Sequence, residues 1–197
     1  MTIATQKLSF EEYLKYDDGS DTRYELVNGE LIPMGVGTGI HALIINFLSE
    51  HLKEALKGLD KEYRVAQGSI GVRSPRKGRW DTSRIPDITV LPLSQLKEML
   101  AREAVIECHE DPPLLVVEVV SGSTQTEDYR AKRVEYNLLG IQEYWIVDPK
   151  AECVTLCELR DDLYDLSELR GKDVLNSSVL PAFSMTAQQT LSAGLQS

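Results

Sequence analysis

The chain has few cysteines, no long apolar run and fewer basic than acidic residues. Its three cysteines, Cys108, Cys153 and Cys157, form no Cys-x-x-Cys pair, so neither a disulfide framework nor a zinc site is predicted. No apolar run reaches the about 20 residues that span a bilayer, and the first residues lack a signal-peptide core. We therefore expect a cytoplasmic protein without a membrane partner.

The charge balance is acidic. Asp and Glu number 31 against 21 Lys and Arg, which gives a formal net charge of −10. Proteins that bind duplex DNA usually present a basic surface, so this balance counts against broad contact with phosphates. One local segment without acidic residues carries Arg73, Arg76, Lys77 and Arg79. It predicts either a phosphate-binding surface or a solvated loop.

The length of 197 residues and the hydrophobic content of 42% predict one domain over residues 1–197. Strand patterns lie near 62–72, 86–91, 114–120, 143–148 and 154–159. Helical patterns lie near 40–57, 94–104 and 125–139, after a short helix capped by Ser9 and Glu12. The fold class is therefore predicted as α/β, a mixed β-sheet flanked by helices, with an N-terminal β-hairpin over 22–34. The polar tail after Ser184 is expected to be loosely ordered.

Two carboxylates interrupt apolar strand patterns. Asp87 follows Pro86 at the start of one strand, and Glu118 stands in the continuous apolar run Leu114–Val120. An unpaired carboxylate buried there would cost roughly several kcal/mol, so each needs a cation, a metal or a proton. A structural ion pair with an arginine is the alternative for either residue alone.

The helix expected over 125–139 carries a lysine. Thr124 and Glu127 form a capping-box pattern at its start. Asp128 and Lys132 are spaced by four and share one face. Lys132 is expected to point toward the sheet, and an exposed pair with Asp128 is the alternative. Strand, helix and strand together predict a crossover unit whose two strands are parallel.

Two further residues are candidates. The hairpin signal Asn28-Gly29 predicts that Glu25 lies opposite Ile32. Glu25 is either a fourth site residue or the partner of an arginine. His41 follows the glycine-rich loop 35–39 at the first turn of a helix and is either a site residue or a core histidine.

Four motifs resemble those of the bacterial Uma-type family of restriction-endonuclease-like proteins in the PD-(D/E)XK nuclease superfamily: Pro86-Asp87, Glu118-Val119-Val120-Ser121, Asp128 with Lys132, and the run Glu143–Pro149. The segment Tyr24–Leu31 followed by His41 and the segment Val179–Ser184 extend the resemblance over most of the chain. In the superfamily pattern a lysine stands two residues after the second acid. That place is Val120 here, so the resemblance implies that Lys132 takes over the role.

The resemblance implies an endonuclease that depends on Mg²⁺, with Mn²⁺ as an alternative metal, and that acts on double-stranded DNA as a homodimer. Asp87, Glu118 and the backbone carbonyl of Val119 would bind the metal, which activates water and neutralises charge on a phosphate. Lys132 would orient or deprotonate the attacking water, or stabilise the charge that develops on the phosphorus centre. Ser121 would join the basic loop in binding substrate.

Two other functions stay open. The chain could keep the nuclease fold as a dimeric binding or regulatory protein with little activity. It could also cleave RNA or single strands, which suits its acidic composition better.

Overall fold

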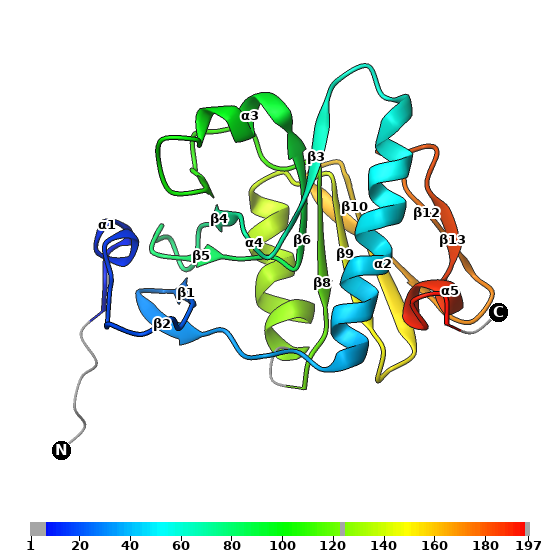
Figure 1. The fold of residues 1–197 in the computed structure, drawn as a ribbon, viewed down its shortest axis with the longest axis horizontal. Coiled ribbons are helices and arrows are strands. Elements are labelled where there is room, and N and C mark those ends of the chain that lie inside the picture. The colour runs from blue at the N-terminus through cyan, green and yellow to red at the C-terminus, as the bar shows by residue number, and fades with distance from the viewer. Residues whose placement is uncertain (1–6, 123–124, 196–197) are drawn as a thin grey trace.

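The computed structural model describes residues 7–122 and 125–195. Its largest sheet has six strands in the order β11-β10-β9-β8-β6-β3 (Figure 1). These strands are β3 (Tyr63–Gln67), β6 (Ile88–Pro92), β8 (Leu115–Val119), β9 (Glu143–Asp148), β10 (Cys153–Arg160) and β11 (Leu163–Leu169). β8 and β9 pair in parallel, as predicted, while the other neighbours pair antiparallel. The mixed α/β fold is thus confirmed.

Helix α2 (Gly39–Ala55) packs against one face of this sheet. Its buried residues Leu48 and Leu52 share a hydrophobic core with Val117 and Trp145. The helix begins at the N-cap Thr38 and continues into the 3₁₀ turn η1 (Leu56–Gly58). The prediction of a helix near 40–57 is confirmed, and the apolar stripe of that helix explains why it lies on the sheet.

A second helix covers the opposite face. It consists of the π-helix η2 (Glu127–Lys132) followed by α4 (Arg133–Leu138). Tyr136 of α4 is buried and packs edge-on against Tyr144 of the sheet, with ring centroids 5.0 Å apart. The clusters at the two faces place η2–α4 and α2 on opposite sides of the six-stranded sheet (Figure 1). Thr124, the proposed cap, lies outside the described residues.

A five-stranded sheet in the order β2-β1-β5-β4-β7 lies beside the larger one. Its strands are β1 (Tyr24–Val27), β2 (Glu30–Pro33), β4 (Gly71–Arg73), β5 (Ser83–Arg84) and β7 (Val105–Ile106). The hairpin of β1 and β2 pairs Glu25 with Ile32, as predicted. Its turn needs two left-handed residues, and Asn28 (φ 52°) and Gly29 (φ 83°) supply them.

Smaller elements complete the chain. They are α1 (Phe10–Leu14), α3 (Leu93–Glu98), β12 (Val174–Asn176), β13 (Ser184–Thr186) and α5 (Ala187–Leu191). The capping box of Ser9 and Glu12 begins α1, as predicted. No helix in the described part of the chain is both long and apolar enough to cross a membrane.

Three expectations about the elements were wrong. The run 62–72 is two strands in different sheets, because the chain turns at Gly68, which has a φ of 49°. The helix near 94–104 ends at Glu98, since the residues after it lead into β7, which pairs with β4. The tail after Ser184 forms β13 and α5, whose capping box joins Thr186 and Gln189.

Candidate active site

The register of β6 and β8 brings the two predicted carboxylates together. Ile88 pairs with Val117, so Asp87, just before Ile88, and Glu118, just after Val117, lie at the same end of this strand pair. Asp87 lies just before β6, and its Oδ2 accepts the backbone N–H of Val119 at 2.7 Å. This bond fixes the carboxylate of Asp87 at the end of β8.

His41 contacts the same oxygen. Its Nε2 lies 3.3 Å from Asp87 Oδ2, and the two side chains are 17% and 20% exposed. The hydrogen bond to Asp87 raises the pKa of His41 above its usual value against the opposing effect of burial. The loop before α2 approaches the ring closely, because a Cβ on Gly37 would lie 2.5 Å from His41 Nδ1. His41 is therefore a polar contact of Asp87 rather than a core residue.

Lys132 points from the helix toward the sheet, as predicted. Its Nζ lies 2.9 Å from Glu118 Oε1, 3.0 Å from Asp128 Oδ1 and 4.0 Å from Glu25 Oε1. The hydroxyl of Tyr136 donates to the same Glu118 oxygen at 3.0 Å. Only 5% of the Lys132 side chain is exposed. The lysine thus sits buried among three carboxylates.

Burial and charge shift the pKa values of this pair. Burial raises the pKa of Glu118 well above its usual value; Lys132 opposes this shift, and Asp87 is among the carboxylates that add to it. Burial alone would lower the pKa of Lys132, but Glu118, Glu25 and Asp128 outweigh it and raise that pKa. Lys132 is therefore an ammonium at neutral pH.

The cluster holds more acidic than basic groups. Four carboxylates, those of Asp87, Glu118, Asp128 and Glu25, surround Lys132 and the His41 imidazole. Neither Asp87 Oδ1 nor Glu118 Oε2 accepts a hydrogen bond from a residue that the structure describes. Hard divalent cations bind carboxylate oxygens of this kind. These residues therefore fit a metal such as Mg²⁺.

Glu25 joins this cluster to a second one. Its Oε1 accepts the N–H of Ile85 at 2.9 Å and faces Lys132. Its Oε2 accepts from Arg84 Nη1 at 3.2 Å. Both predicted alternatives for Glu25 thus occur together: it pairs with an arginine and reaches the lysine of the site.

The family model of Uma2, described as "Putative restriction endonuclease", matches residues 10–188. The chain belongs to the Uma2 family. A crystal structure described as a putative nuclease belonging to DUF820 from Anabaena variabilis is similar to it, with a TM-score of 0.75 and 17% sequence identity. The alignment covers 95% of this chain and 99% of that chain, so the two share a fold. No curated protein matches the chain.

The arginines of the basic loop in this Uma2 member are all paired with carboxylates, those of Arg73 and Arg76 from distant parts of the chain and that of Arg79 from its neighbour Asp81. Arg73 pairs with Glu107 at 3.0 Å and lies over the Phe10 ring, and Arg79 pairs with Asp81. Arg76 pairs with carboxylates of the helix η2–α4. Lys77 is exposed in the left-handed region, with a φ of 52°. Ser121 is half-buried and lies two residues after the end of β8.

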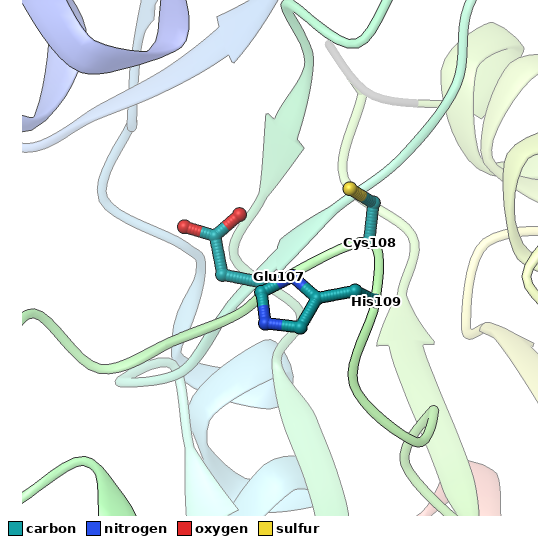
Figure 2. A group of neighbouring side chains, drawn as sticks. All are labelled: Glu107, Cys108 and His109. Atoms are coloured by element: carbon teal, nitrogen blue, oxygen red, sulfur yellow. The ribbon is translucent and has the colours of Figure 1, made fainter.

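Glu107, Cys108 and His109 form another group of potential metal ligands (Figure 2). One ligand atom from each lies within 4.8 Å of the others, and no other group of three or more such residues is this close among the residues described. Glu107 is already paired with Arg73, while Cys108 and His109 are exposed. The group lies after β7 and is separate from the carboxylates of the Uma2 motifs.

Sequence reasoning missed Arg84 and its partners Glu127 and Glu135. Arg84 Nε donates to Glu135 Oε2 at 2.8 Å, and Arg84 Nη2 donates to Glu127 Oε2 at 2.7 Å. The sequence around Arg84 carries little signal, because the strand β5 consists only of Ser83 and Arg84 and follows Asp81 and Thr82. Which acidic residues pair with Arg84 depends on the tertiary fold.

Proposed function

We propose that the protein is a divalent-metal-dependent endonuclease that hydrolyses phosphodiester bonds in DNA, with residues 1–197 as one nuclease domain. The observation that carries the proposal is the convergence of Asp87, Glu118 and Lys132 from two strands and a helix. Their cluster has more negative charge than its own cations neutralise, and the chain belongs to a restriction endonuclease family.

Asp87 and Glu118 would hold the metal, with the carbonyl of Val119 as a third ligand. Mg²⁺ is the first candidate and Mn²⁺ the second. When bound, the metal would neutralise charge on the scissile phosphate and lower the pKa of a coordinated water. His41 would orient Asp87 through the contact at 3.3 Å, because outer hydrogen bonds fix the position of a ligating carboxylate.

Lys132 would stabilise the charge that develops on the phosphate. Its raised pKa keeps it protonated, which suits an electrostatic role or donation of a proton and disfavours a role as general base. Asp128 and Glu118 hold its ammonium at 3.0 and 2.9 Å. Glu25 would support the same amine from the hairpin.

Arg73, Arg76, Lys77, Arg79 and Ser121 would contact a double-stranded DNA substrate. A homodimer would place two such sites on one duplex and so permit cleavage of both strands. The pairing of the three arginines with carboxylates and the net charge of −10 favour few phosphate contacts. A second candidate function is a nuclease acting on RNA or single strands, which the acidic composition suits better; a dimeric binding or regulatory protein with little activity is a third.

Cleavage of supercoiled plasmid with Mg²⁺ or Mn²⁺ tests the proposal. Asp87→Asn, Glu118→Gln and Lys132→Met should abolish nicking, as should EDTA. Glu168→Gln on the exposed edge strand β11 is the matched control and should cut as the wild type does. If the wild-type protein leaves the plasmid intact, or if the three variants cut it, the proposal of a DNA nuclease is refuted. Labelled single-stranded DNA and RNA in parallel reactions test the second candidate.

A further inference from the structure

We infer that Arg84 is a positioning residue, which locks the helix bearing Lys132 against the small sheet bearing Glu25. Nothing in the superfamily pattern of two acids and a lysine calls for this arginine. Its effect on cleavage rests on the proposed function, whereas its effect on the position of Lys132 does not.

The contacts of Arg84 join three separate elements. Its side chain, on β5, is only 2% exposed. Nε and Nη2 donate to the two oxygens of Glu135 at 2.8 and 3.1 Å, and Nη2 also donates to Glu127 at 2.7 Å. Nη1 donates to Glu25 on the hairpin at 3.2 Å. One guanidinium therefore ties helix, hairpin and β5 together.

The two helix partners flank the lysine. Glu127 stands five residues before Lys132 and Glu135 three residues after it, so Arg84 holds the helix on both sides of the amine. The planar fork of an arginine matches a carboxylate with two parallel bonds, whereas an ammonium is a single point charge. A lysine at position 84 would keep the charge and lose the fork.

The location of Lys132 explains why such a lock is needed. The hydrogen bonds of a sheet fix the position of a lysine on a strand. The position of a lysine on a helix depends instead on how firmly the whole helix packs against the sheet. Lys132 ends the π-helical segment η2, a winding that is rare and often found at functional sites. Breaking a buried ion pair on one side leaves uncompensated charge, so the fully paired arrangement is strongly preferred.

Acylation of lysines by a water-soluble succinimidyl ester, read by mass spectrometry on the full chain without metal or substrate, tests the lock. Arg84→Lys should make Lys132 react about tenfold faster, since hydrogen bonds to charged groups are lost. Arg76→Lys is the matched control: Arg76 contacts Glu127 and Glu135 but not Glu25, is 24% exposed, and should leave the rate within about twofold of wild type.

In the plasmid assay Arg84→Lys should lower kcat about tenfold and leave KM unchanged, because the DNA contacts are untouched. If Arg84→Lys does not melt cooperatively, Glu135→Gln, which weakens the same fork, replaces it. Wild-type reactivity of Lys132 in the folded variant would overturn the inference. If the wild type cuts no plasmid, the proposed function fails, while the acylation rates still decide the role of Arg84.

Discussion

The imidazole of His41 and the carboxylate of Asp87 form a pair in which one oxygen, Asp87 Oδ2, serves two donors. His41 Nε2 lies 3.3 Å from it, and the N–H of Val119 donates to it at 2.7 Å. Helix α2 and strand β8 therefore both fix the position of this carboxylate. The other oxygen, Oδ1, accepts no hydrogen bond from a residue that the structure describes.

The pKa of His41 should lie above the usual value of about 6.5, because of the hydrogen bond to Asp87. A group with a raised folded pKa contributes stability below its unfolded pKa, and this stability is lost as pH rises through the folded pKa. The free energy of unfolding of wild type should therefore exceed that of His41→Gln most at pH 6 and least at pH 9. Nitrogen NMR of the ring gives the pKa directly.

Mg²⁺ provides the control for this measurement. A cation on Asp87 competes with the imidazolium, so added Mg²⁺ should lower the pKa of His41, and Asp87→Asn should lower it without metal. A pKa of His41 that ignores both changes contradicts the assignment of Asp87 as a shared partner.

Gly37→Ala should impair the site without unfolding the chain. The new Cβ would lie 2.5 Å from His41 Nδ1 and 2.8 Å from its Cγ, so the ring must move away from Asp87. We expect the pKa of His41 to fall and nicking to slow, with the melting temperature nearly unchanged because the loop is exposed. Gly35→Ala is the matched control, since nothing lies within 4 Å of its Cβ. Equal behaviour of the two variants would refute the role of the loop.

Lys132→Met should destabilise the chain by about 3–5 kcal/mol, because it leaves buried carboxylates without their cation. For a chain of this length that corresponds to a fall in Tm of roughly 10 °C. Adding Glu118→Gln should restore part of the loss, since it removes one of the uncompensated charges. Calorimetry on the two single variants and the double variant measures this coupling. Simple additivity of the two losses would mean that the pair does not interact.

Lys77→Ala and Arg73→Ala should separate DNA binding from stability. Lys77 is exposed, so its loss should weaken binding to duplex DNA and reduce the slope of log K against log salt by about 0.9 if it contacts one phosphate. Arg73 pairs with Glu107 and stacks on Phe10 at 4.0 Å, so its loss should lower Tm. If Lys77→Ala leaves the slope of log K against log salt unchanged, Lys77 does not contact DNA.

The local parts of the fold were predictable from sequence. Asn28-Gly29 sets the hairpin register because both residues adopt the left-handed region, and the apolar run around Glu118 identifies a buried strand. The break at Gly68 was missed, because a single glycine inside a strand pattern does not reveal that the chain changes sheets. The helix α5 was missed because it is short and its polar composition hides two buried residues, Ala187 and Thr190.

The candidate site was only partly predictable, for a related reason. The motifs identify Asp87, Glu118 and Lys132, and their placement follows from strands and a helix that are adjacent in sequence. Arg79 pairs with its near neighbour Asp81, but the partners of Arg73, Arg76 and Arg84 come from distant segments of the chain. Local charge patterns carry no information about such pairings.

The Arg84 network also bears on the order in which the candidate site can assemble during synthesis of the chain. Arg84 contacts Glu25 across 59 residues and Glu135 across 51. A nascent chain that has reached only the middle of its length can form the hairpin and β5, but its buried guanidinium still lacks the helix carboxylates. Such long-range contacts form late in folding. Full compensation of that charge therefore waits until the helix that carries Glu127 and Glu135 has been synthesised.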